Sequence, residues 1–165
     1  MFSRIFAAII SFFMWLFPCL QTTQPLDNET IANSVINAVK TRDIAAIEAL
    51  MCKNIKDNVP NLTNEIGNLL DAYAISGEDF EFSWKTSGGY FESNGKGKSI
   101  RQNYIDIHIT NATCHYLLII VLETHNSFAS DEMGIRSISI GPKTTPASDE
   151  FYFIRATEGV MEWHE

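Results

Sequence analysis

Residues 104–110 read Tyr-Ile-Asp-Ile-His-Ile-Thr, and residues 117–122 read Leu-Leu-Ile-Ile-Val-Leu. In the first stretch apolar and polar side chains alternate, which is typical of a strand with one buried face. The second stretch is apolar on both faces, which favours a strand in the centre of a sheet. Between them Asn111-Ala112-Thr113 predicts a turn. The two stretches therefore form the middle of an antiparallel sheet.

The sheet extends on both sides of this pair. Four strands in hairpin order are predicted at about 80–91, 98–110, 114–124 and 133–140. Gly88-Gly89 predicts a bulge or a sharp bend in the first strand, and Asn94-Gly95-Lys96-Gly97 predicts the turn that follows it. Residues 151–154 are a candidate fifth strand at one edge.

Three helices are predicted before the sheet, at about 28–40, 43–52 and 61–73. In each of them apolar residues recur at spacings of three and four, which places them on one face of a helix. Asp43 and Asn61 are suitable N-caps. Because helices and strands are segregated along the chain, we expect an α+β fold with three N-terminal helices packed on a curved four-stranded antiparallel sheet.

The N-terminus is predicted to be a signal. An apolar run from Ile5 to Phe17 follows one positive charge, Arg4, which is the pattern of a secretory signal. The run is shorter than the roughly 20 residues of a transmembrane helix.

How this signal is processed stays open. Leu16 and Cys19 have the spacing of a bacterial lipoprotein box, but Phe17 and Pro18 stand where small residues are usual. The signal is compatible with three outcomes: lipidation of Cys19, simple secretion, and retention as an uncleaved anchor. Each of them predicts an exported protein, either at the cell envelope or secreted.

The 165 residues are enough for one domain. We expect a signal over 1–20, a linker over 21–27, the α+β domain over 28–140, and an acidic tail over 141–165. The net charge of −8 argues against nucleic acid and against an anionic membrane surface as partners, since both bind basic faces. Membrane contact is therefore expected only through the N-terminus.

Two cysteines lie inside the expected domain. Outside the cytoplasm Cys52 and Cys114 could form a disulfide. Unpaired cysteines also pack as small apolar residues, and the apolar contexts of both favour free thiols.

The sequence contains no recognisable set of catalytic residues. An enzyme of isomerase or dehydratase type needs a general base that faces a pocket. Asp106 and His108 share a face of one strand, but Ile105, Ile107 and Ile109 on the other face should contact the helices. We therefore expect no catalytic residues, and no cofactor. A pocket between sheet and helices is predicted to be lined by Phe82, Trp84, Ile107 and Leu117.

Weak candidates for a metal site are His108, His115 and Asp106. A two-residue turn at Asn111-Ala112 would place His108 directly opposite His115. Ala112 fits such a turn poorly, and a three-residue loop would place Tyr116 opposite His108 instead. We therefore expect no metal.

The chain resembles a family of uncharacterised, secreted bacterial lipoproteins with a cystatin-like, nuclear transport factor 2-like fold. The resemblance covers residues 30–140 and rests on the signal, on a Lys-Thr-Arg-Asp turn at residues 40–43, and on three further segments. These are Ala49-Leu50-Met51-Cys52-Lys53-Asn54, Thr113-Cys114-His115-Tyr116 and Met133-Gly134-Ile135-Arg136-Ser137-Ile138. The resemblance implies a cone-shaped fold and no known activity.

These features predict an exported, envelope-associated binding or interaction module whose partner is a protein or a small molecule. The exposed sheet is also available for homodimer formation. The alternative is a small-molecule isomerase or dehydratase that uses the pocket of the cone. A protease inhibitor that presents a hairpin is a third class, for which we find no inhibitory loop.

Overall fold

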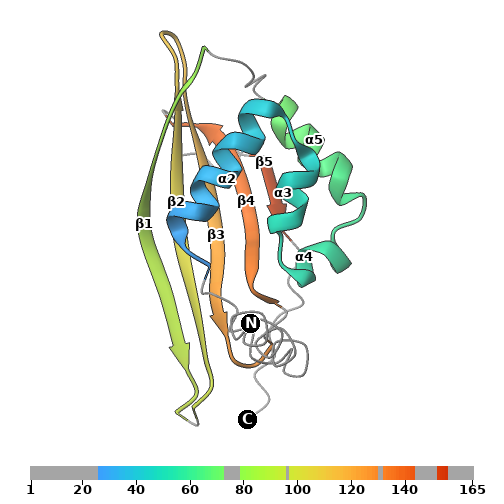
Figure 1. Ribbon diagram of the computed structural model, residues 1–165, viewed down its shortest axis with the longest axis vertical. Coiled ribbons are helices and arrows are strands. Elements are labelled where there is room, and N and C mark those ends of the chain that lie inside the picture. Colours follow the sequence, from blue (N-terminus) through green and yellow to red (C-terminus); the bar gives the residue numbers. More distant parts are fainter. Residues whose placement is uncertain (1–25, 73–78, 96, 130–131, 144–151, 156–165) are drawn as a thin grey trace, which may run out of the picture.

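The computed structural model describes residues 26–72, 79–95, 97–129, 132–143 and 152–155. In these ranges the elements are α2 (Asn28–Thr41), α3 (Ile44–Leu50), α4 (Lys53–Asn58), α5 (Leu62–Asp71), β1 (Glu81–Ser93), β2 (Ser99–Thr110), β3 (His115–Asn126), β4 (Gly134–Pro142) and β5 (Tyr152–Arg155). The strands form one open antiparallel sheet in the order β1-β2-β3-β4-β5, and the helices lie on one face of it (Figure 1). The predicted α+β class is confirmed.

The described residues contain four helices where three were predicted. The helix expected over 43–52 ends at Leu50, because Met51 and Cys52 adopt extended backbone and α4 begins directly afterwards. Met51 forms a parallel bridge to Ile135, and the Cys52 amide donates to the Ile135 carbonyl at 3.0 Å. This pairing with β4 interrupts the helix, and a long-range contact of that kind leaves no mark in local periodicity.

The sheet has five strands, since β5 pairs with β4 and confirms the candidate edge strand. β3 is central, as its run of apolar residues predicted. The predicted bulge in β1 is present, with its register shift between Thr86 and Gly88. A β-carbon on Gly89 would be 3.1 Å from the Gln102 carbonyl oxygen, so the two backbones approach closely there.

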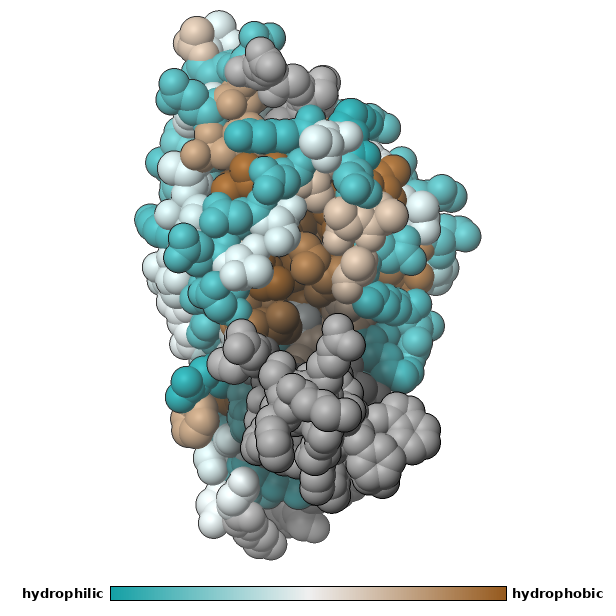
Figure 2. Space-filling view, viewed as in Figure 1, coloured by the Kyte–Doolittle hydropathy of each residue, from teal (hydrophilic) through white to brown (hydrophobic). Residues whose placement is uncertain are grey.

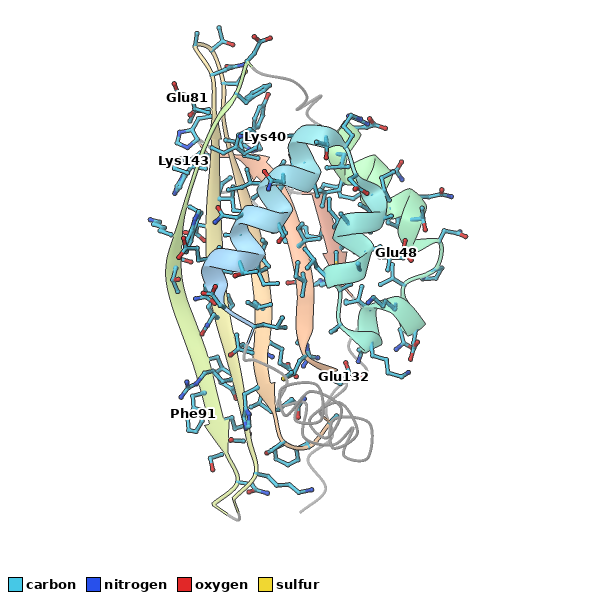
Figure 3. The ribbon with its side chains drawn as sticks, in the orientation of Figure 1. Lys40, Glu48, Glu81, Phe91, Glu132 and Lys143 are labelled. Carbon is cyan, nitrogen blue, oxygen red and sulfur yellow. The ribbon has the colours of Figure 1, made fainter. Side chains whose placement is uncertain are left out.

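The core fills the space between the sheet and the helices (Figure 3). Ile105, Ile107 and Ile109 are buried and face the helices, as predicted. They pack with buried residues of β3, β4 and the helices: Leu118, Ile120, Leu122, Ile135, Ile138, Ile140, Val35, Ile47, Ile66 and Leu69. The opposite face of the sheet carries no described helix (Figure 1).

The two predicted N-cap residues, Asp43 and Asn61, differ in whether they cap their helices. The Asp43 side chain accepts from the Ala46 amide at 2.9 Å and caps α3 as expected. Asn61 precedes α5, but it adopts a left-handed conformation and its side chain makes no capping bond. Among the described residues, no helix is long and apolar enough to cross a membrane. The predicted signal over 1–20, with Cys19, lies outside the described residues.

Candidate functional site

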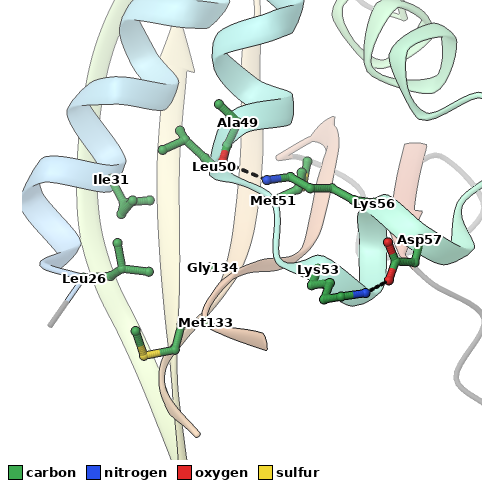
Figure 4. Close-up of a pocket in the computed structure, with 10 residues that line it drawn as sticks. All are labelled: Leu26, Ile31, Ala49, Leu50, Met51, Lys53, Lys56, Asp57, Met133 and Gly134. Atoms are coloured by element: carbon green, nitrogen blue, oxygen red, sulfur yellow. Dashed lines mark hydrogen bonds and ion pairs between the residues drawn. The ribbon is translucent and has the colours of Figure 1, made fainter. Parts of the chain in front are cut away.

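A pocket of about 310 Å³ opens between the start of α2, the α3–α4 connection and the start of β4 (Figure 4). Its lining consists of Leu26, Ile31, Ala49, Leu50, Met51, Lys53, Lys56, Asp57, Met133 and Gly134. Apolar side chains gather between α2 and α3 on this face of the molecule (Figure 2). The volume is near the lower end of the range for small-molecule sites.

One wall of the pocket depends on a close contact between two backbones. Gly134 has a φ of +132°, and a β-carbon there would be 2.9 Å from both the Cys52 nitrogen and the Leu50 oxygen. Only glycine avoids both the clash and the strain of this conformation. The contact brings β4 directly against the α3–α4 connection and holds Met51 and Met133 on the same pocket.

The start of α4 is capped from a distant part of the chain. Cys52 makes no side-chain capping bond, and Glu132 instead accepts from the Asn54 amide at 3.0 Å. A carboxylate at a helix N-terminus is favourable because the free amides and the helix dipole attract negative charge. Burial raises the pKa of the Cys52 thiol, so this sulfur remains protonated beside the pocket.

Charged side chains form only the rim of the pocket. Lys53 and Asp57 form an ion pair, and the Lys56 ammonium donates to the Ala49 carbonyl at 3.1 Å (Figure 4). These three residues are exposed, whereas Ile31 and Met51 in the interior are buried. The arrangement suits a ligand with an apolar body and a polar or anionic end, since the cations can reach the end that stays in water.

The described pocket is lined by none of the four residues that the sequence predicted for a pocket, which are Phe82, Trp84, Ile107 and Leu117. Ile107 belongs to the buried core, and Phe82 and Trp84 are partly buried and pack against this core from the same side of the sheet. Leu117 lies on the other face, because its neighbour Leu118 is the buried one. A strand that is apolar on both faces gives no local signal for the side that faces the helices.

Sequence reasoning missed the observed pocket, and the one signal that could have pointed to it lies in the segments that carry the family resemblance. Two segments on which it rests, residues 49–54 and 133–138, are about 80 residues apart in the sequence. The structure brings them together through the pairing of Met51 and Cys52 with Ile135. The first segment contributes four residues to the pocket lining and the second contributes two, Met133 and Gly134.

His108 and His115, which we expected to lie apart, are in contact. The connection between β2 and β3 has four residues, 111–114, and Thr110 pairs with His115. A loop with an even number of residues keeps His108 and His115 on the same face of the sheet. The expected three-residue loop, which would have placed Tyr116 opposite His108, is therefore wrong. Asn111 closes the loop by accepting from the amides of Thr113 and Cys114 at 2.9 and 2.8 Å.

His108 Nδ1 and His115 Nε2 are 3.2 Å apart. Burial lowers the pKa of both histidines, and Lys143 lowers it further. Asp106, also on the open face, accepts from the Ser87 hydroxyl at 2.7 Å. Within the described ranges no group of three or more His, Cys, Asp or Glu side chains could hold a metal ion.

Cys52 and Cys114 are both free in the structure. Cys52 is buried at the start of α4, and Cys114 is half-buried in the β2–β3 loop.

Comparison with models of protein families assigns this chain to a family. A model of the DUF5104 family, a domain of unknown function, matches residues 34–150, and the chain belongs to this family. A search of curated proteins finds no match to the chain.

Proposed function

We propose that this chain is an exported, envelope-associated binding module that takes a small amphipathic ligand in the pocket between α2, α4 and β4. We further propose that the domain is a cystatin-like, nuclear transport factor 2-like variant of the α+β class. The observation that carries the functional proposal is the lining itself, an apolar interior with charge only at its rim.

The rim also argues against the enzymatic alternative. An isomerase or dehydratase needs an acid or base that is held in the pocket beside the reacting atoms. Lys53, Lys56 and Asp57 are the charged residues of the described lining, and all three are exposed at its edge. Glu123, the fully buried carboxylate of the described residues, does not line this pocket.

The position of the pocket supports a ligand from the membrane. Leu26 lines the pocket and lies seven residues after Cys19. Seven residues reach at most about 25 Å. A lipid on Cys19, or an uncleaved anchor, would therefore hold the pocket close to the bilayer. A molecule with a short acyl chain and an anionic end matches both the lining and this location.

Native mass spectrometry of the full-length protein, extracted gently from its own host, is the first test. We expect a diacylglyceryl-sized addition at the N-terminus and a retained non-covalent mass of an amphiphile. A chain that has lost residues 1–20, carries no lipid and retains no ligand would overturn envelope anchoring and ligand retention together. The same spectrum reports the number of subunits and thereby tests the homodimer.

Decanoate is the probe for the pocket, and its binding to the full-length protein can be measured by calorimetry. Ala49→Trp fills part of the pocket, whereas Ala45→Trp places the same bulk on an exposed site of α3 outside the lining. We expect Ala49→Trp to weaken binding by at least about tenfold, equivalent to 1.4 kcal/mol, and Ala45→Trp to leave it unchanged. Equal effects of the two variants, or no binding by the wild type, would overturn the proposed ligand class.

A further inference from the structure

We propose that His108 and His115 form a two-histidine site for a divalent transition-metal ion, such as Cu²⁺ or Zn²⁺, on the open face of the sheet. Their facing ring nitrogens, Nδ1 of His108 and Nε2 of His115, are 3.2 Å apart. Two nitrogen ligands at 2.0–2.1 Å from one tetrahedral ion are separated by about 3.3 Å. The observed spacing is thus close to the one that a shared ion requires.

The ring orientation also permits a shared ion. The two ring centroids are 5.4 Å apart and the ring planes make an angle of 60°, so the rings meet edge to face and do not stack. Imidazole nitrogen is a ligand that suits Cu²⁺, Zn²⁺ and Ni²⁺. Without a metal, one ring must donate its N–H to the other for the short contact to be favourable.

The backbone holds the two rings in place. His108 pairs with Leu117 and His115 pairs with Thr110, so the histidines are diagonal neighbours on one ladder. A slip of one residue would move the buried Ile107 and Ile109 to the open face, which the core prevents. Because the register is fixed by the opposite face, the two ligands are positioned before any ion binds.

Water molecules should supply the remaining ligands of the metal ion. Both histidines are only partly buried on the face that has no described helix, and no third ligand of the described residues joins them. Asp106 lies two residues before His108 on the same face of β2, where its carboxylate can accept a hydrogen bond from a metal-bound water.

The charges around the histidine pair determine how tightly it should bind a metal ion. Lys85 and Lys143 act on His108 as nearby positive charges, and Asp106 is the opposing negative charge. Lys143 and Glu81 lie at the same end of the sheet (Figure 3). Two cations near a cation site weaken binding, so the removal of Lys143 should strengthen it.

The test is calorimetric titration of the full-length, chelator-treated protein in detergent with CuCl₂ and with ZnCl₂. We expect one ion per chain and tighter binding of Cu²⁺ than of Zn²⁺. His108→Gln and His115→Gln should each weaken binding by at least about tenfold, as loss of one of two ligands requires. Lys143→Gln should strengthen it.

His125→Gln is the matched control, because His125 is an exposed histidine of β3 that contacts Ser99 and not the pair. It should leave the affinity unchanged. Electron paramagnetic resonance of the Cu²⁺ complex should show two imidazole nitrogens in the wild type and fewer in either variant of the pair. The proposal fails if the double variant His108→Gln/His115→Gln binds as tightly as the wild type, or if His125→Gln weakens binding equally.

Discussion

Gly134 lies so close to Cys52 that a β-carbon on the glycine would be 2.9 Å from the Cys52 nitrogen. The Cys52 amide in turn donates to the carbonyl of Ile135, the residue after the glycine. Through this contact the first residues of β4 hold the segment between α3 and α4 in extended form. The same two segments form one side of the pocket.

Gly134→Ala should therefore destabilise the fold. The substitution adds a clash with backbone atoms to a φ of +132°, and strain of this kind costs on the order of 3 kcal/mol. Gly67→Ala in α5 is the control, because its β-carbon would meet only the Ile44 Cδ1 at 3.6 Å. Alanine is favoured over glycine in a helix by up to about 1 kcal/mol, so this variant should be neutral or stabilising. Urea denaturation measures both, and equal stabilities would contradict the role of the contact.

Glu123 is fully buried and depends on its partners. Its carboxylate accepts from Arg136 at 2.8 Å, from Gln102 at 3.0 Å and from Asn126 at 2.6 Å. Arg136→Ala leaves a buried carboxylate without its cation, and such losses cost about 3–5 kcal/mol. Lys53→Ala breaks an ion pair whose side chains are 51% exposed, and should cost less than about 1 kcal/mol. A loss for Arg136→Ala as small as that for Lys53→Ala, measured by denaturation, would show that water reaches Glu123.

The histidine pair should make stability depend on pH. Burial lowers the pKa of His108 and His115 from 6.5, so the unfolded chain binds more protons than the folded chain below that pH. The stabilisation is fully present above about pH 6.5 and is lost as the pH falls through the lowered values. In the presence of a chelator, we expect the free energy of unfolding to decrease from about pH 7.5 to about pH 5.5. The decrease should be smaller in His108→Gln/His115→Gln, and an unchanged slope in that variant would exclude the pair as its source.

The two free thiols of the described fold should differ in reactivity. Hydrogen bonds from Thr113 and then Tyr116 lower the pKa of Cys114, whereas burial raises the pKa of Cys52. The thiolate is the nucleophile, so a short pulse of iodoacetamide near neutral pH should label Cys114 well before Cys52. Peptide mass spectrometry separates the two sites, and denaturant should remove most of the difference. Equal labelling in the folded protein would mean that Cys52 is accessible.

Sequence patterns did not predict most of the candidate site. The alternation of Ile105, Ile107 and Ile109 placed Asp106 and His108 on the open face, which the structure bears out. The contact between His108 and His115 was considered and rejected in favour of a three-residue loop, whereas the structure has a loop of four residues that Asn111 closes with its own side chain. The number of residues in a turn decides which face of the sheet each side chain of the next strand occupies. The sequence predicts that number poorly.

By itself the sequence determined the α+β class, the hairpin order of the strands, the central position of β3 and the facing of β2. These properties follow from periodicity, which acts between residues close together in the chain. Only the tertiary structure decided that the helix over 43–52 divides at Met51 and that the divided segment forms a pocket with Gly134. Those features depend on contacts across some 80 residues, where the fit of two backbones, and not local preference, sets the conformation.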